Sequence, residues 1–439
     1  MGSKAIRQLL SVNKKAVAIN TILISNSFIW YAYALNYIKT ATNLNDQLPI
    51  MALHFVGLFS ALIIGESLSH KVKDNLTFLR LWMLSGIFLS MMPLITEMTN
   101  SGLLVFSVIA GINFGFGIPT SLNYFASTTV ANNRGKIGGT IFFLTGLGAF
   151  LLSVIGTEGS ITVSIVLTSW RAFGFLALLF AKPSQQGTIK QQQISYREII
   201  SNRVFLLYFV PWIIFVFINS MSFPINTEVF KNVDISFSTN VEFVLAGISA
   251  IIFGFFADSK GRKRLAVAGF AMLGLGYAIL GFTAPDTTGW WLYTFIDGIT
   301  WGIFITIFVF ILWGDIGEGR NSARIYAIGI MPYLLSSLIR LSIGSYFGTY
   351  VRDQGFGTIF SFFSFFLFIA VLPLVLAPET MSEQTLRTSD LKNYVEKAKK
   401  QVKKTEKKQQ EIQPKEETQD GTEDSEEYKR AKEIAEKYY

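Results

Sequence analysis

The feature that most limits how this chain can fold is a series of apolar runs, each about 20 residues long, that recur along most of its 439 residues. A helix of that length crosses the hydrocarbon core of a bilayer. Charged residues gather between the runs and after residue 382. This disfavours a soluble α/β fold, which needs strands of about four to eight residues and charges spread throughout. The sequence therefore predicts an all-α membrane protein.

Twelve runs have the required length. The expected transmembrane helices cover residues 16–38, 48–69, 76–96, 102–125, 136–156, 160–181, 203–224, 240–257, 264–282, 289–312, 323–347 and 356–377. No small-residue cleavage site follows the first run, so we interpret it as a retained span and not as a signal peptide.

Basic residues are distributed very unequally between the two sides of these spans. If the N-terminus is cytoplasmic, the inner segments up to residue 378 contain nineteen Lys and Arg residues, and the outer loops contain only Lys39, Lys231 and Arg352. The positive-inside rule then predicts that both termini are cytoplasmic, and the short loops favour the plasma membrane. The net charge of +8 is a topology signal, so no nucleic-acid partner is expected.

Several kinds of chemistry are excluded by composition. The chain has no cysteine and only two histidines, so neither disulfides, thiol nucleophiles nor a metal-binding cluster are expected. No nucleophile, base and orienting group occur at a recognisable spacing. We expect no cofactor, no metal and no enzymatic activity.

An internal repeat divides the chain. A shift of 189 residues places the first six spans on the last six, with Gly65 on Gly254 and Leu76 on Leu265. This predicts two six-helix bundles of equal orientation, with a substrate site at the seam between them. The expected parts are an N-terminal bundle at 1–182, a cytoplasmic linker at 183–202, a C-terminal bundle at 203–378 and a charged cytoplasmic tail at 379–439.

The segment GFFADSKGRKR (254–264) resembles the signature loop of the major facilitator superfamily, G-x-x-x-D-x-x-G-R-[RK]. The matching positions are Gly254, Asp258, Gly261, Arg262 and Lys263. NNRGKIGG (132–139), GDIGEGRNSAR (314–324) and PET (378–380) are similar to weaker marks of the family. The chain departs from the pattern in its first half, where Ser69 replaces the aspartate and Val72 the glycine. The glycine-proline signature of antiporters is also absent from the span at 136–156.

The resemblance implies that Asp258 faces the N-terminus of the helix at 136–156, near Arg134 and Lys136. A carboxylate there is stabilised by the helix dipole and would act as a latch at the inner end. The alternative interpretation is that the whole loop is only a topology signal.

Charges inside spans are costly and therefore indicate function. Asp297 and Arg340 lie at comparable depth on neighbouring spans, which predicts an ion pair or an ion-coupling device. Arg171 is expected to have a structural partner, and Glu66 to reach headgroups or Lys71.

Polar and aromatic residues follow one face of the helices that the resemblance assigns to a central cavity. The alternative interpretation is that these stripes make contacts between helices, or form an aromatic belt at the membrane interface, and do not line a cavity. The predicted substrate-binding residues are Asn26, Trp30, Asn113, Thr120, Trp212, Asn219, Asp297, Thr300 and Trp301.

These observations predict a monomeric secondary transporter that moves a small solute by alternating access, is coupled to protons or sodium, and contacts membrane lipid. Sugars or other polyols would suit the aromatic and amide groups, and amphipathic cations would suit aromatics with a carboxylate. Drug or lipid efflux by the same fold is an alternative. A membrane sensor or scaffold that acts through the tail is another.

Overall fold

The computed structural model describes residues 14–69, 72, 74–95, 99–156, 159–181, 194–317 and 322–381, and these residues are helical apart from short connections. The first six spans form α2 (Lys14–Ala41), α3 (Leu44–Ser69), α4 (Asn75–Ser90) with the short α5 (Met92–Ile95), α6 (Asn100–Thr128), α7 (Ala131–Ile155) and α8 (Ser160–Leu179).

The short helix α9 (Tyr196–Ser201) precedes the second set. The last six spans form α10 (Arg203–Val229), α11 (Ile235–Lys260), α12 (Arg262–Thr283), α13 (Thr287–Phe304) with its extensions η2 (Ile305–Ile311) and α14 (Leu312–Ile316), α15 (Ala323–Gln354) and α16 (Phe356–Leu376).

The helices match the predicted twelve-span fold. Among the described residues, eleven helices are long and apolar enough to cross a membrane, and α2 is the span that falls short of this measure. The apolar side chains that remain exposed, such as Phe180 and Phe282, face outward as lipid-facing residues do. An all-α membrane fold is confirmed.

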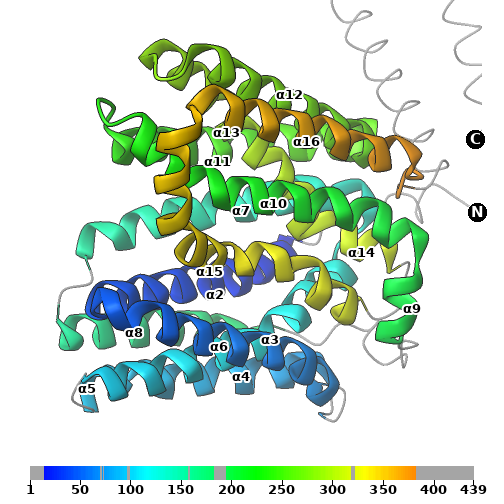
Figure 1. Cartoon of the computed structure of the whole chain (residues 1–439). Helices are drawn as coiled ribbons and strands as arrows, with labels where there is room; N and C mark the ends of the chain where they lie inside the picture. The colour runs from blue at the N-terminus through cyan, green and yellow to red at the C-terminus, as the bar shows by residue number, and fades with distance from the viewer. Residues whose placement is uncertain are drawn as a thin grey trace, which may run out of the picture. The chain divides into compact units, whose positions relative to one another are not determined.

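Helices from each half pack mainly with one another. In the first half α3 packs on α6, α4 on α8, and α2 on both α7 and α8. In the second half α12 packs on α16 and α13, and α10 on α15. Figure 1 shows α3, α4 and α6 together at one side and α12, α13 and α16 together at the other. These are the two six-helix bundles that the repeat predicted.

The two bundles touch where α7 meets α11 and where α3 meets α15. The α7–α11 contact brings backbones together, because a Cβ on Gly139 would lie 2.1 Å from the carbonyl oxygen of Ala250. Small residues allow this approach in membrane helices, where close packing replaces the hydrophobic effect as the source of association.

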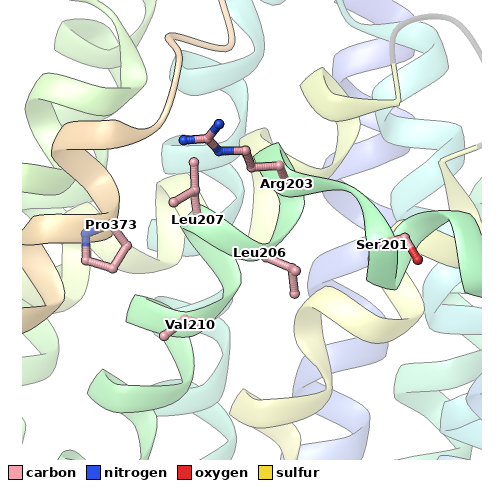
Figure 2. Close-up of a pocket in the computed structure, with 6 residues that line it drawn as sticks. All are labelled: Ser201, Arg203, Leu206, Leu207, Val210 and Pro373. Atoms are coloured by element: carbon pink, nitrogen blue, oxygen red, sulfur yellow. The ribbon is translucent and has the colours of Figure 1, made fainter.

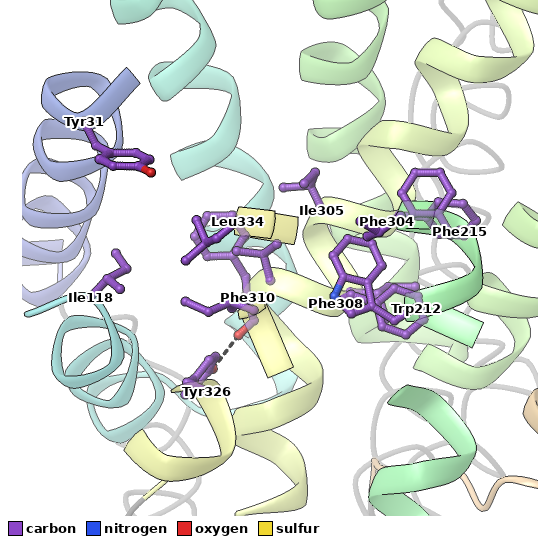
Figure 3. Packing of buried hydrophobic residues seen from close by; sticks show 14 of the residues in the cluster. Tyr31, Ile118, Trp212, Phe215, Phe304, Ile305, Phe308, Phe310, Tyr326 and Leu334 are labelled. Atoms are coloured by element: carbon purple, nitrogen blue, oxygen red, sulfur yellow. Dashed lines mark hydrogen bonds between the residues drawn. The ribbon is translucent and has the colours of Figure 1, made fainter. Parts of the chain in front are cut away.

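A seven-residue π-helix, η2, interrupts the tenth span, which was expected to be one continuous helix at 289–312. Every side chain of η2 is buried, and a Cβ on Gly138 of α7 would lie 2.7 Å from Cβ of Phe310. A π-helix replaces the i→i+4 hydrogen bonds of an α-helix with i→i+5 bonds, and such segments are frequent at functional sites. The Tyr326 hydroxyl donates a hydrogen bond to the Phe310 carbonyl oxygen at 2.7 Å (Figure 3).

The predicted domain limits remain predictions. The linker at 183–202 is described only from residue 194. Within it α9 begins at Tyr196, after the N-cap Ser195, whose hydroxyl accepts from the Glu198 N–H at 3.1 Å. The predicted tail at 379–439 lies outside the described residues after Met381.

Candidate gate and binding residues

The carboxylate of Asp258 joins the two bundles. It lies near the end of α11, is 4% exposed, and its two oxygens accept hydrogen bonds from the N–H groups of Gly135 and Lys136, each at 2.8 Å. These N–H groups lie near the N-terminal end of α7, where the helix dipole favours an anion. This is the position that the sequence resemblance implied.

Glycine makes room for this contact. A Cβ on Gly135 would lie 2.4 Å from the carbonyl oxygen of Gly254 and 2.7 Å from Oδ1 of Asp258. A Cβ on Gly254 would lie 2.3 Å from the carbonyl oxygen of Gly135. The two backbones therefore approach as closely as their atoms permit. We call the end of the helices at which the 258–264 loop lies the basic end.

A second carboxylate at the basic end, that of Asp315 on α14, binds two arginines from different bundles. Arg134 of α7 donates to Oδ1, and Arg262 of α12 donates from Nε to Oδ2 at 3.0 Å. Arg262 is fully buried and also donates to the carbonyl oxygen of Ala257 at 2.6 Å. A buried charge is stable only when it is paired in this way.

Glu379, in the PET segment that follows α16, completes this set of charges. Its two oxygens accept from the N–H groups of Arg262 at 2.9 Å and Lys263 at 3.1 Å, so the carboxylate caps the N-terminus of α12. Gly261 precedes this cap with φ of 97°, a conformation that favours glycine. We refer to Arg134, Asp258, Arg262, Asp315 and Glu379 together as the basic-end cluster.

A separate ion pair lies on the other side of the basic end. Nε of Arg324, on α15, donates to Oε2 of Glu66, on α3, at 2.7 Å. Tyr196 of α9 lies beside it, with its ring 5.2 Å from the Arg324 guanidinium carbon. Burial, and then the negative charge of Glu66, raise the pKa of Tyr196 to about 12, so its phenol is neutral. Lys71, the partner considered from the sequence, lies outside the described residues.

Asp297 and Arg340 do not form a direct ion pair among the described residues. Oδ2 of Asp297 accepts a hydrogen bond from the Tyr293 hydroxyl at 3.1 Å. The guanidinium of Arg340 lies 4.0 Å from the ring centre of Phe223. Glu242 of α11 interacts electrostatically with both Asp297 and Arg340. Its backbone lies against α13, because a Cβ on Gly298 would lie 3.3 Å from the Glu242 Cα. We call Glu242 and Asp297 the carboxyl pair.

Three of the predicted binding residues in the first bundle lie around the buried Arg171 of α8. Its guanidinium donates to Oγ of Ser27 at 3.0 Å and lies over the rings of Trp30 and Trp82, at 4.9 Å and 4.4 Å. Asn26 accepts from the same guanidinium at 3.4 Å. The indole N–H of Trp82 in turn donates to the carbonyl oxygen of Asn113 at 2.6 Å. Asn26, Trp30 and Asn113 therefore contact neighbouring helices of their own bundle.

The remaining predicted binding residues lie in different settings. Trp212 is fully buried, donates to the Gly329 carbonyl oxygen at 3.0 Å and stacks on Phe308. Trp301 is partly exposed and packs edge-on against Phe215 at 4.9 Å. Asn219 is also partly exposed.

Two threonines complete the predicted set, and both are buried. Thr300 donates to the backbone carbonyl of Asp297 at 2.9 Å. The hydroxyl of Thr120 has no hydrogen-bond partner among the described residues. The structure thus brings Thr300 together with the carboxyl pair, and it leaves Thr120 as a buried hydroxyl able to bind a further group.

Sequence reasoning missed four functional candidates. Asp315 and Glu379 stand inside GDIGEGR and PET, which were quoted as family marks without a partner. Arg324 was counted only as a topology signal. Glu242 was overlooked because its span was expected to begin at residue 240, whereas α11 begins at Ile235 and places Glu242 two turns inside the helix.

An open apolar groove of about 360 Å³ lies apart from these residues, between the start of α10 and α16 (Figure 2). It is lined by Ser201, Arg203, Leu206, Leu207, Val210 and Pro373. None of the predicted site residues contributes to it.

Two bundles of six membrane-length helices, joined at one end by polar contacts, define the class of two-bundle helical transporters. The family described as Major Facilitator Superfamily matches residues 16–313, which is more than half of the chain. The chain belongs to this superfamily, and its function is transport across a membrane. A search of curated proteins finds no significant sequence match.

Solved structures of transporters share the fold. The proton:xylose symporter XylE, bound to 6-bromo-6-deoxy-D-glucose, is 15% identical with a TM-score of 0.63, over 87% of this chain and 98% of that chain. The Escherichia coli fucose:proton symporter FucP is 13% identical with a TM-score of 0.65, over 83% and 98%. The human organic anion transporter MFSD10 (TETRAN) is 13% identical with a TM-score of 0.56, over 84% and 99%.

Proposed function

We propose that the protein is a secondary active transporter that moves a small neutral polyhydroxyl solute by alternating access, coupled to protons, in the plasma membrane. The basic end faces the cytoplasm in this proposal, as the positive-inside rule requires. The observation on which the proposal rests is the pair of bundles held together at the basic end by polar contacts that can be exchanged for water.

The contacts at the basic end suit a gate. Asp258 to α7, Asp315 to Arg134, and Glu66 to Arg324 each join one bundle to the other through a few hydrogen bonds. Such contacts have defined geometry, and water can replace them when the bundles separate. A two-state transporter needs closed and open forms that differ by only a few kcal/mol. The basic-end cluster therefore serves as the inner gate, closed in the conformation described here.

The carboxyl pair suits proton coupling. Two interacting carboxylates in a buried site repel each other when both are charged, so a proton on one of them is favoured. Asp297 is 2% exposed, and its Oδ1 receives no hydrogen bond from an amide, hydroxyl or guanidinium of the described residues. Arg340 is the cation that interacts with Glu242. Loss of the proton would leave two negative charges side by side, which Arg340 would have to compensate, and a shift of Arg340 from Phe223 would couple the proton to the helix positions.

The solute class follows from the side chains near the boundary of the bundles. Trp212, Trp301 and Tyr333 form a connected aromatic group there, with ring centres 6.2 to 6.4 Å apart for the pairs that include Tyr333. Aromatic faces with a few polar groups suit the ring and hydroxyls of a sugar. Two of the similar structures are a proton:xylose symporter and a fucose:proton symporter.

The test is solute-driven proton entry into proteoliposomes that contain a pH-sensitive dye. D-xylose and L-fucose, added outside, should acidify the interior. Glu242→Gln and Asp297→Asn should abolish acidification yet retain exchange of labelled sugar between the two sides. Glu228→Gln is the matched control, since Glu228 is a surface acid of the same bundle that pairs with Lys231 at 2.7 Å.

Two results would contradict this function. Absence of sugar uptake by the wild type would exclude the solute class. Uptake with unchanged proton movement in both carboxyl-pair variants would exclude coupling at that pair.

A further inference from the structure

His54 of α3 is fully buried, and both of its ring nitrogens have partners. Nδ1 lies 2.8 Å from the backbone carbonyl oxygen of Ser107 on α6, and Nε2 lies 2.9 Å from the hydroxyl of Tyr31 on α2. A carbonyl oxygen can only accept, so Nδ1 must hold a hydrogen. In a neutral imidazole Nε2 then has a lone pair, and the Tyr31 hydroxyl must donate to it.

A charged imidazole is not favoured at this site. The charged side chain that interacts with His54 is Lys39, which is itself positive. Among the described residues no carboxylate forms an ion pair with His54. An uncompensated buried charge is costly, so the neutral form with its hydrogen on Nδ1 is the form that these contacts hold.

The direction of the Tyr31 hydroxyl is fixed by packing. Its ring stacks on Phe114, with ring centres 4.0 Å apart and planes inclined by 13°. The imidazole occupies space left by Gly111, where a Cβ would lie 3.2 Å from Nδ1 of His54. Tyr31 therefore keeps its single hydrogen toward His54, and its oxygen can only accept a hydrogen bond from any other group.

Tyr31 lies on the side of the first bundle that faces the second. Tyr31 interacts electrostatically with Tyr333 of α15, which belongs to the second bundle. The ring of Tyr333 packs with Trp212 and Trp301. Figure 3 shows Tyr31 on one side of the buried cluster and Trp212 on the other, with Leu334 between them.

We propose that Tyr31 determines specificity by offering the transported solute an oxygen that accepts and cannot donate, and that His54 is the positioning residue that enforces this. The matching group on the solute is a hydroxyl that donates, as in a neutral polyol. The proposal rests on the proposed function, because it assigns one contact of the solute in that transport cycle.

The first experiment tests the hydrogen-bond direction without any solute. The chain has only two histidines, so ¹⁵N-histidine labelling of a His70→Gln protein leaves one imidazole in the NMR spectrum. At neutral pH we expect a protonated Nδ1 and an unprotonated Nε2. Tyr31→Phe should shift the Nε2 resonance without changing the tautomer. A protonated Nε2, in either a neutral or a charged ring, would overturn the assignment.

The second experiment tests the contact with the solute. Binding of D-xylose is compared with binding of its monodeoxy and monodeoxyfluoro analogues, because fluorine accepts weakly and cannot donate. At one position of the sugar both analogues should bind about threefold to tenfold more weakly than the parent, which is the range of one neutral hydrogen bond. Tyr31→Phe should bring the parent down to the level of these analogues, so that the difference at that position disappears.

Two further variants separate specificity from folding. Tyr33→Phe removes a hydroxyl from the same helix, where it donates to the Gly156 carbonyl within the first bundle, and it should leave the preference intact. His54→Phe frees the Tyr31 hydrogen, so the fluoro analogue should regain affinity relative to the parent.

The outcomes distinguish this proposal from the proposed function. If the wild type binds D-xylose but tolerates the fluoro analogue at every position, the role of Tyr31 is refuted and transport is not. If the wild type binds no sugar, the polyol class fails, and this assignment fails with it.

Discussion

The two places related by the 189-residue shift at the basic end are closed by different chemistry. Asp258 corresponds to Ser69, and Gly135 corresponds to Arg324. On the α7–α11 side a buried carboxylate binds backbone N–H groups at a helix N-terminus. On the α3–α15 side Ser69 donates to its own helix, at the Glu66 carbonyl, and Glu66 pairs with the Arg324 side chain instead.

The comparison shows that the first half of the repeat lacks the aspartate of the signature loop but still makes a polar contact with the other bundle, through Glu66 and Arg324. Among the described residues Ser69, at the position that matches Asp258, makes no bond to the backbone of α15, but Arg324, at the position that matches Gly135, reaches Glu66, which lies one turn before Ser69. The first contact is short, buried and fixed by backbone geometry. The second depends on a long side chain, and Arg324 keeps 17% of its side chain exposed, so water and salt weaken it more.

The largest effect should come from Asp315, which no residue of the α3–α15 side matches. Asp315→Ala leaves Arg134 and Arg262 buried without their shared anion, so we expect a loss of about 3 to 5 kcal/mol in unfolding free energy. Thermal and denaturant unfolding of the purified protein measure it. Asp286→Ala, which removes only the cap of α13, should cost about 1 kcal/mol. Equal losses would show that the two arginines do not depend on Asp315.

Asp258→Asn should open the basic end. The variant loses the negative charge and one of the two acceptor oxygens that bind N–H groups of α7, which corresponds to about 1.5 to 3 kcal/mol. Because the chain has no cysteine, a single Ser69→Cys, at a position 2% exposed, reports opening through its maleimide labelling rate. We expect a rise of about tenfold or more. Asp234→Asn, at the opposite end of α11, is the control and should leave the labelling rate unchanged. An unchanged labelling rate in Asp258→Asn would refute the role of Asp258 as a latch.

Gly139→Ala tests the close approach that only the α7–α11 side requires. Its Cβ would meet backbone of α11, which cannot move aside as a flexible side chain can, so overpacking should cost about 1 to 3 kcal/mol. The labelling rate of Ser69→Cys should rise here too. Gly146→Ala on the same helix meets nothing within 4 Å and should be neutral or stabilising. Similar stability losses and labelling rates for both glycine variants would mean that the close approach of α7 and α11 is not needed to close the basic end.

Glu66→Gln should have the smallest effect, about 1 kcal/mol, because the amide oxygen can still accept from Arg324 and because Arg324 also donates to the Ile194 carbonyl oxygen at 3.0 Å. The effect should shrink at high salt, since part of the Arg324 side chain is exposed. The same labelling assay at low and high ionic strength measures it. A charge-reversed pair, Glu66→Arg with Arg324→Glu, should restore closure in part. An effect as large as that of Asp258→Asn would remove the proposed difference between the two sides.

The sequence by itself determined the number of spans, the two bundles and the signature loop. Each depends on properties that a linear pattern records: the length of an apolar run, the period of a repeat, and the spacing of charges in a short loop. The contact of Asp258 with α7 could also be expected, because the resemblance named both partners.

Only the tertiary structure decided which polar side chains meet. Asn26, Trp30 and Asn113 formed stripes that suited a cavity, but their contacts are made with Arg171 and neighbouring helices of one bundle. Glu242 joined Asp297 because α11 begins earlier than its apolar run. Helical spacing fixes the face on which a residue lies, whereas its partner depends on the rotation and depth of a second helix, which are set by packing across the whole bundle.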